Sequence, residues 1–406
     1  MVTKNTTIGG WFPADTDPEG FGGMPGHLPW LGLPLRERQE RAFLQAKISF
    51  SSDEAIGSTP DTAARVLVRE DVVLTNFAVE ALIARGELEQ KDIQWRGAGR
   101  FGAFCAQIAM GDPGPFLVWL TPGGQITPER IRSAEAIEFD AAERLIHVPA
   151  PNPQLGADLI ELPLSDRLVL PVGHWLQLLW ANLMGLPTFL WRELAGRNPV
   201  EVVFKGIWTA LLTGSTDPMK IGARMGRKGK GCRIHPSAVV EGSWLGDGVE
   251  VGANAVVRGS VLADGVHVED LSLVEFSVLA ERARVQRLGM VKFSVLGTEA
   301  AGGGAIQLSV LAPGASVKHA AALMDVSLGQ QGVQVMRQGT LCNAPLGFGG
   351  VCVGPGTTIG AGVMVGPGRM VPGGLNVARS PDQIVRSIPT GITGTVSVKN
   401  GKLEPI

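Results

Sequence analysis

Cysteine is scarce in this 406-residue chain, and its four copies stand far apart at Cys105, Cys232, Cys342 and Cys352. No two of them form a CxxC pair, so the sequence indicates neither a zinc ribbon nor a disulfide framework. An excess of basic charge is also missing, because 36 basic residues face 38 acidic ones. This balance excludes a large positive field, and we expect no nucleic-acid partner.

An apolar run of signal-peptide length is missing from the N-terminus, MVTKNTTIGGWF, and we expect a cytoplasmic protein. A long uncharged stretch does occur later, VLPVGHWLQLLWANLMGLPTFLW at 169–191. Its glycines, prolines and polar residues argue against a membrane span. The spacing of its apolar residues predicts a buried helix over 174–185, between domains or subunits, that ends before Pro187. Peripheral contact with a membrane through its tryptophans is the alternative.

The C-terminal half repeats itself every 17 residues. SWL at 243–245 becomes SVL at 260–262, 277–279 and 294–296. Three columns at this spacing are aliphatic in every repeat: Ile234, Val251, Val268 and Val285; Val240, Val257, Val274 and Val291; and Leu245, Leu262, Leu279 and Leu296. The steps within a repeat are six, five and six residues, which do not fit the 3.6-residue period of a helix.

Short strands separated by bends do fit these steps. Three strands would form one triangular turn with an aliphatic side chain pointing inward from each side, and successive turns would stack. We interpret TEAAGGGAIQ (298–307) as an insertion or a loosened turn, after which the columns resume at Leu311, Val317, Leu323 and Leu328. The serines of the SVL triplets would hydrogen-bond along one wall. The sequence therefore predicts a parallel solenoid with a filled aliphatic interior.

Closer to the C-terminus the repeat shortens to six residues, with aliphatic–glycine pairs at 353–354, 359–360 and 365–366. These pairs and the three columns resemble the hexapeptide-repeat family, the left-handed parallel β-helix of many acyltransferases and sugar-nucleotide enzymes. The resemblance covers about residues 221–376. It implies a homotrimer or a larger homo-oligomer, and the same coil also serves regulation and assembly.

The first part of the chain has a different pattern. Strand-like runs at 64–76, 115–120 and 136–149 alternate with helical segments. We expect one helix over 75–86, capped by Thr75 and stopped by Gly86, and another from Thr127, with Pro128 in its first turn. Strands alternating with helices predict an α/β domain.

The stretch MPGHLPWLGLPLRERQERAFLQAK (24–47) resembles the early region of nucleotide-diphospho-sugar transferases, with Gly32, Pro34, Leu35 and Glu37 matching the turn into a helix. The resemblance implies that Asp71, in VREDVVL, is a metal- or nucleotide-binding residue. The family's loop of glycines with an arginine is not matched, because residues 8–26 carry Asp15, Asp17 and Glu19 and no arginine or lysine. A degenerate nucleotide site follows from that departure.

Acyltransferases on this coil commonly use a histidine as general base, because imidazole titrates near neutrality. His319 and His267 are our candidates, and Asp325 would orient His319. His235 follows an inward isoleucine and is expected to be structural. The intervals between these histidines, 32 and 52 residues, are not multiples of the repeat, so we expect no metal site.

The cluster ARMGRKGKGCR (223–233) lies just before the first regular turn. Its residues Arg227, Lys228, Lys230 and Arg233 are candidates for holding a phosphate, an anionic polysaccharide or a lipid head group. The alternative is a solvated linker and cap.

These observations divide the chain into an α/β nucleotidyltransferase-like domain (1–150), an apolar helical connector (151–220), a left-handed β-helix (221–390) and a C-terminal hairpin or cap (391–406). We expect a transferase-like protein of sugar-nucleotide or surface-polysaccharide metabolism that uses acyl-CoA or a nucleotide sugar with Mg²⁺ and a small sugar substrate. The alternative is a non-catalytic trimeric scaffold or regulatory subunit whose active sites have eroded.

Overall fold

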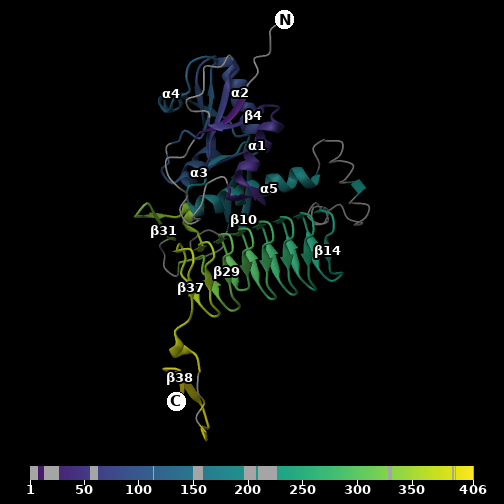
Figure 1. The fold of residues 1–406 in the computed structure, drawn as a ribbon, viewed down its shortest axis with the longest axis vertical. Helices are drawn as coiled ribbons and strands as arrows, with labels where there is room; N and C mark the ends of the chain where they lie inside the picture. The colour runs from purple at the N-terminus through teal and green to yellow at the C-terminus, as the bar shows by residue number, and fades with distance from the viewer. Residues whose placement is uncertain are drawn as a thin grey trace.

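A computed structural model of the chain describes residues 8–12, 27–54, 63–112, 114–149, 159–195, 207–208, 226–327, 332–385, 388 and 390–405. A smaller α/β region lies above an all-parallel β-solenoid that runs from β13 to β37 (Figure 1). Both predicted fold types are confirmed. Within the described part of the chain, no helix is long and apolar enough to cross a membrane.

The N-terminal region is built on a six-stranded sheet in the order β4-β1-β5-β8-β7-β9, in which β8 runs antiparallel to both neighbours. Its strands are β1 (Ile8–Phe12), β4 (Ser49–Glu54), β5 (Arg65–Arg69), β7 (Ile93–Gly97), β8 (Leu117–Leu120) and β9 (Glu135–Phe139). Its helices are α1 (Leu35–Gln45), α2 (Asn76–Glu89), α3 (Gly99–Ala109) and α4 (Pro128–Ser133). Short paired strands complete the region: β2 (Pro29–Trp30), β3 (Leu33–Pro34), β6 (Val72–Leu74), β10 (Arg144–Pro149), β11 (Leu159–Leu164) and β12 (Val169–Pro171).

Two helix boundaries show which local signals decide the fold. Helix α4 begins as predicted, because the Thr127 hydroxyl accepts a hydrogen bond from the Arg130 N–H at 3.2 Å. Helix α2 follows Thr75 but continues through Gly86, so the predicted stop at this glycine is wrong. A Cβ on Gly86 would lie 2.2 Å from Cδ2 of Trp119. The glycine is therefore needed for the close approach of α2 to the sheet, not for a turn.

Helix α5 (Trp175–Ala195) is the apolar connector, and it continues through Pro187. The predicted end before this proline is wrong. Leu186 and Leu190, on either side of the proline, are both buried, and Phe189 packs edge-on against Trp244 with ring centroids 6.3 Å apart. The free energy gained by burying these side chains offsets the loss of the backbone hydrogen bond that the proline cannot make. Side chains of the helix share one buried cluster with residues of the N-terminal region and of the solenoid.

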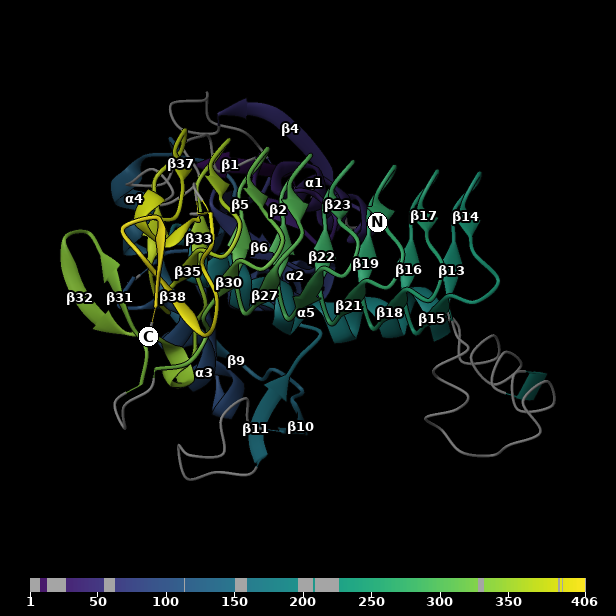
Figure 2. The same cartoon turned by 90° about the horizontal axis from the view of Figure 1, so that it is seen from below.

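The solenoid has three walls, each a parallel sheet (Figure 2). The helix wall contains β13 (Arg227–Lys228), β16 (Trp244–Leu245), β19 (Val261–Leu262), β22 (Val278–Leu279), β25 (Val295–Leu296), β28 (Val310–Leu311), β33 (Cys352–Val353) and β36 (Met370–Val371). The histidine wall contains β14 (Arg233–Ile234), β17 (Glu250–Val251), β20 (His267–Val268), β23 (Arg284–Val285), β26 (Ala301–Gly302), β29 (Ser316–Val317), β34 (Thr358–Ile359) and β37 (Asn376–Val377). The open wall contains β15 (Val239–Glu241), β18 (Val256–Arg258), β21 (Leu273–Glu275), β24 (Met290–Lys292), β27 (Ala305–Gln307), β30 (Ala322–Leu323) and β35 (Met364–Val365).

The three aliphatic columns line the interior as predicted, one from each wall. In the helix wall Leu245, Leu262, Leu279 and Leu296 pair in direct register from one turn to the next. All four belong to one buried cluster with the inward residues of the other two walls. The repeat therefore encodes a stacked prism with a filled core.

The run at 298–307 is a shortened turn, and its interpretation as an insertion is wrong. Val285 pairs with Gly302, and Val291 pairs with Ile306, so the register of the walls is kept. Gly302 takes the inward position because a Cβ there would lie 2.7 Å from Cδ1 of Ile306. The long insertion comes later, between β30 and β33, and carries the hairpin of β31 (Gln334–Arg337) and β32 (Thr340–Asn343) and the turn η3 (Pro345–Gly347). The predicted column residue Leu328 lies outside the described residues.

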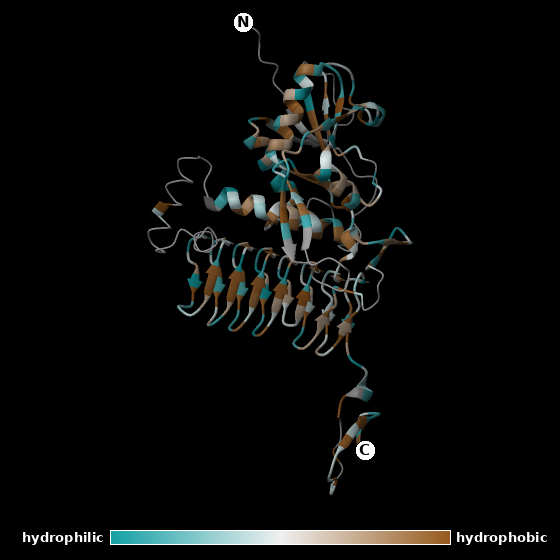
Figure 3. Cartoon of the chain, turned by 180° about the vertical axis from the view of Figure 1, so that it is seen from behind, coloured by the Kyte–Doolittle hydropathy of each residue, from teal (hydrophilic) through white to brown (hydrophobic). Residues whose placement is uncertain are grey.

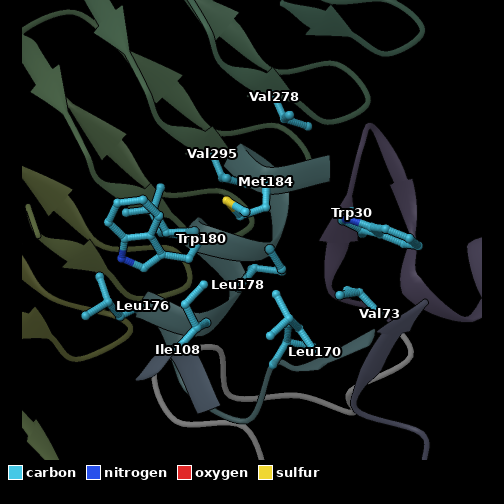
Figure 4. Close-up of a cluster of buried hydrophobic side chains, with 14 of the residues drawn as sticks. Trp30, Val73, Ile108, Leu170, Leu176, Leu178, Trp180, Met184, Val278 and Val295 are labelled. Carbon is cyan, nitrogen blue, oxygen red and sulfur yellow. The ribbon is translucent and has the colours of Figure 1, made fainter. Parts of the chain in front are cut away.

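Each residue of the SVL triplet faces a different environment. The leucine points into the solenoid, and the valines of the helix wall, such as Val278 and Val295, lie under α5 (Figure 4). They share one buried cluster with Trp180 and Met184 of the helix. This cluster joins the solenoid to the N-terminal region through an apolar core.

The C-terminal residues form the predicted hairpin of β38 (Val396–Lys399) and β39 (Lys402–Pro405). Asn400 and Gly401 at its turn have φ angles of 52° and 74°, as a type I′ turn requires. The short turn η4 (Pro381–Gln383) precedes it, and the hairpin projects beyond the last turn of the solenoid (Figure 1).

Candidate functional site

Asp71 lies in the turn between β5 and β6, where the carboxylate is held inside a buried ion-pair network. Arg69 donates from Nε to Asp71 Oδ1 at 2.5 Å and from Nη2 to Asp112 Oδ2 at 2.6 Å. The same guanidinium lies 5.0 Å from the centre of the Phe116 ring. Arg69 and Asp71 are both buried. One arginine therefore bridges the two carboxylates from within the protein.

The two carboxylates of this network differ in their pKa values. Burial raises the pKa of Asp71 above its usual range, and the nearby Arg69 charge opposes that effect only in part. Burial also acts on Asp112, but hydrogen bonds and charge from Arg69 hold the pKa of that carboxyl below its usual value. Burial disfavours the charged form of Arg69, yet both carboxylates together raise its pKa above its usual value. The arginine stays charged and hydrogen-bonds both carboxyl groups, and its single positive charge can offset one of their two negative charges.

These residues do not fit the Mg²⁺ site that the nucleotidyltransferase resemblance implies. A divalent cation needs free carboxylate oxygens, and those of Asp71 and Asp112 face the Arg69 guanidinium. Nowhere in the described ranges do three histidine, cysteine, aspartate or glutamate side chains gather as a metal site would require.

The candidate histidines lie apart on the surface of the solenoid. His267 points outward from β20, with Nε2 3.8 Å from Oε2 of Glu250 and 38% of its side chain exposed. His319 is exposed at the corner after β29. Its expected partner Asp325 instead accepts a hydrogen bond from Gln307 Nε2 at 2.8 Å. His235 is exposed and bonds Ser237 Oγ at 2.8 Å through Nδ1, within its own corner.

The four basic candidates occupy the first turn of the solenoid and do not converge on one point. Arg227 pairs with Glu193 at 2.8 Å, and Arg233 pairs with Glu250. Lys228 takes the inward position of the helix wall, in register with Leu245. Lys230 is exposed at the following corner. Two of the four charges are thus already matched by carboxylates.

A larger cavity of about 560 Å³ lies between β7 and α3, at the loop GAGRFG (97–102). We did not predict this site, although the G-x-G-x-x-G spacing after a strand was a signal in the sequence. The Phe101 N–H in the first turn of α3 donates to Glu143 Oε2 at 2.6 Å. A Cβ on Gly102 would lie 2.1 Å from the Gly97 carbonyl oxygen. The loop thus packs helix on strand, and a carboxylate occupies the place that a phosphate would need.

A second site that the sequence did not reveal is a polar cleft where α1, α2 and α5 meet. It brings together Arg38 of α1, Asn76 of α2 and Arg192 of α5. These residues come from segments far apart in the chain. Their spacing in the sequence therefore carried no signal of a shared site.

No family model matches the sequence, and no curated protein matches it. Among solved structures, the chain is similar to a provisionally assigned acetyltransferase from Bacillus cereus. The match has 15% sequence identity, covers 36% of this chain and 78% of that chain, and has a TM-score of 0.17. A similarity of this size carries no inference about activity.

Proposed function

We propose that the chain is a non-catalytic scaffold or regulatory subunit that assembles into a homotrimer through the open wall of its solenoid. The observation that carries the proposal is an apolar column on the outside of this wall whose residues stay partly exposed and are part of neither buried cluster that contains the solenoid walls. The helix wall has a similar outer column, and there α5 covers it.

The outer column of the open wall consists of half-buried apolar residues that alternate with the inward ones: Val239, Val256, Leu273, Met290, Ala305 and Ala322. The corners on its two sides add exposed apolar side chains, with Leu288 68%, Leu271 54% and Phe276 46% exposed. Figure 3 shows the solenoid from behind, opposite the wall that carries β14, β29 and β37. In this view, strands coloured as hydrophobic are stacked one after another along the solenoid. Such a continuous patch is typical of a protein–protein interface.

Charges along the edge of the same wall favour a second copy as its partner. Arg258 pairs with Glu241 at 2.8 Å and with Glu275 at 3.4 Å, and Lys292 pairs with Glu275 at 3.2 Å. The ladder alternates in sign and is balanced within the chain. A neutral apolar surface can meet its own copy without repulsion between like charges.

The Arg69 network supports the non-catalytic part of the proposal. A nucleotidyl transfer needs a divalent cation to neutralise phosphate charge. Here the positive charge beside Asp71 comes from the side chain of Arg69. Because this side chain is part of the protein, it cannot leave the site as an exchangeable metal ion can when a nucleotide binds.

Sedimentation velocity at micromolar concentration tests the proposal, with a trimer as the expected result for the wild-type chain. Leu273→Glu places a charge in the middle of the outer column and should yield monomers with an unchanged far-UV circular dichroism spectrum. Thr358→Glu, on the histidine wall, is the matched control and should remain trimeric. A monomeric wild-type chain, or a trimeric Leu273→Glu variant, would contradict the proposal.

The pair formed by His267 and Glu250 favours acyl transfer as a second candidate function. Nε2 of the imidazole would take the proton of a sugar hydroxyl or amine while that group attacks the carbonyl carbon of an acyl-CoA. The C–S bond then breaks, and the proton passes to the leaving thiolate. Release of free thiol from acyl-CoA with a sugar acceptor would reveal this activity. His267→Ala should abolish thiol release, and His235→Ala should leave it unchanged.

A further inference from the structure

The cleft between α1, α2 and α5 has a volume of about 80 Å³, which is enough to enclose a small group and too little to enclose a whole nucleotide. The first turn of α2, with Thr75 and Asn76, contributes the positive end of a helix dipole. Arg38, Arg41 and Arg192 also line the cleft. None of its lining residues belongs to the Asp71 network, and two of them, Phe189 and Glu193, contact Trp244 and Arg227 of the helix wall.

Two of these arginines have no carboxylate partner among the described residues. Arg38 donates from Nε to the carbonyl oxygen of Trp30 at 3.3 Å and from Nη2 to that of Leu31, and its guanidinium lies 4.7 Å from the centre of the Phe189 ring. Arg192 donates from Nη1 to Asn76 Oδ1 at 3.1 Å. All these acceptors are neutral, so two guanidinium charges share one cleft without a paired anion.

Burial disfavours the charged form of Arg38. It lowers the pKa of the guanidinium to about 10, and the like charge of Arg41 lowers it further, against weaker support from Glu193 and Glu37. Arg41 itself pairs with Glu37 at 2.6 Å on the surface of α1. An anion in the cleft would relieve the cost of keeping Arg38 charged.

The indole of Trp30 provides an independent sign of a missing acceptor. Trp30 lines the cleft, is only 3% exposed, and its Nε1 has no hydrogen-bond partner. Buried donors of this kind are nearly always satisfied. A Cβ on Gly185 would lie 3.3 Å from this nitrogen, so the glycine keeps the space beside it open.

The position of Trp30 is fixed by hydrogen bonds on both sides. The Leu31 N–H donates to Asn182 Oδ1 at 2.8 Å, and Asn182 Nδ2 donates to the Pro29 carbonyl oxygen at 3.1 Å. Helix α5 therefore holds the tryptophan in place before any ligand arrives, which lowers the entropy lost on binding.

We propose that this cleft binds a phosphate group through Arg38, Arg192 and the indole N–H of Trp30. Two carboxylates also line it, Asp166 and Glu193, and Glu193 is paired with Arg227 at 2.8 Å. Guanidinium groups match the geometry of phosphate oxygens and form charged hydrogen bonds with them. The bound group would belong to inorganic phosphate, a small phosphomonoester or a phospholipid head group. It would link the N-terminal region to α5.

Isothermal titration calorimetry of the full chain with inorganic phosphate tests the site, with all buffers free of phosphate and sulfate. We expect saturable binding that Arg192→Gln weakens at least tenfold. Arg132→Gln removes the same charge from exposed α4 and is the matched control, with unchanged affinity. Gly185→Ala should also weaken binding, because its methyl group fills the space beside Trp30 while every charge remains.

Co-sedimentation with vesicles distinguishes the source of the phosphate. Binding to phosphatidic acid vesicles and not to phosphatidylcholine vesicles, with no response to free phosphate, would assign the cleft to a lipid head group. In that case Arg192→Gln should abolish co-sedimentation, and Arg132→Gln should not.

The proposal is overturned if neither probe binds, or if binding is the same in Arg192→Gln, Gly185→Ala and wild type. If Arg192→Gln fails to fold, Gly185→Ala decides the outcome. Neither experiment depends on the oligomeric state. The outcome for the phosphate site is therefore independent of whether the chain forms the proposed homotrimer.

Discussion

The hydroxyl of Ser260 accepts a hydrogen bond from the backbone N–H of Ser277, one turn later in the solenoid, at 3.1 Å. Ser260 also donates to the carbonyl oxygen of Arg258 at 2.7 Å. The same two bonds recur at Ser243, Ser277, Ser294 and Ser309, and all of these serines are buried. The serine column is thus a ladder of structural hydroxyls along one corner of the prism.

Removing one hydroxyl from this ladder should destabilise the protein. Ser277→Ala leaves the Ser294 N–H and the Glu275 carbonyl without their partner, and we expect a loss of about 1–3 kcal/mol in the free energy of unfolding. Ser316→Ala is the control, since the Ser316 hydroxyl is buried without a partner and its loss should cost nothing. Urea denaturation followed by tryptophan fluorescence measures both. Equal effects of the two substitutions would contradict the role of the ladder.

The inward leucines should be far more sensitive to truncation than a leucine on the surface of the N-terminal region. Leu279→Ala creates a cavity in the middle of the stacked column and should cost about 2–5 kcal/mol. Leu88 of α2 is 72% exposed, and Leu88→Ala should change the stability by less than about 0.5 kcal/mol. The same denaturation experiment compares them, and a small effect at Leu279 would show that the column is loosely packed.

Loss of Arg69 should be severe, because it leaves two neighbouring carboxylates without their cation. Arg69→Met is expected to destabilise the chain by about 3–5 kcal/mol. Adding Asp71→Asn in the same chain removes one of the two charges and should recover part of this loss. A double-mutant cycle of thermal or urea unfolding measures the coupling. Additive effects would mean that the two side chains do not interact.

His174 should make the protein sensitive to mild acid. Burial lowers the pKa of His174 to about 4, and the charge of Arg337 lowers it further, against a hydrogen bond to the Met336 carbonyl. Nδ1 accepts from the Leu176 N–H at 3.2 Å, so a proton on Nδ1 would oppose another N–H. The unfolded chain binds this proton below about pH 6.5 and the folded chain does not. Stability from this group is therefore present above pH 6.5 and falls as the pH drops towards 4.

Between pH 7 and pH 5 this effect should reach about 2 kcal/mol. The measurement is the difference in urea unfolding between wild type and His174→Asn at each pH. The asparagine oxygen can still accept from the Leu176 N–H but does not titrate. Parallel pH profiles of the two proteins would exclude the histidine as the cause.

The solenoid could be predicted from the sequence because every turn solves the same packing problem with the same residue types. The columns of leucine and valine and the serine beside them recur at a fixed spacing. Equivalent positions in successive turns therefore have the same surroundings, either the interior, a corner or the outside of a wall. TEAAGGGAIQ (298–307) was misread because small residues are typical both of loops and of crowded inward positions such as Gly302. Only the register with Val285 distinguishes the two cases.

Helix boundaries and sites depend on contacts that local sequence does not contain. Gly86 and Pro187 are both strong signals for ending a helix, yet the packing of α2 on Trp119 and of α5 on the helix wall overrides them. Asp71 lies beside a strand end, as expected, but Asp112, the other carboxylate bound by Arg69, lies 41 residues away. The cleft of Arg38 and Arg192 joins segments separated by more than a hundred residues, and no spacing rule reaches that far.

Helix α5, with its 21 residues, is about 31 Å long and runs along the solenoid (Figure 1). Neighbouring turns are about 4.8 Å apart, so the helix spans about six of them. Its contacts extend from β16 to β28, and the outer column beneath it ends at Cys352. The wall has eight strands, so the helix covers only part of it, and the outward Met370 of β36, past the end of the buried column, is 43% exposed. The run of buried outer side chains is therefore matched to the length of the helix and not to the length of the solenoid.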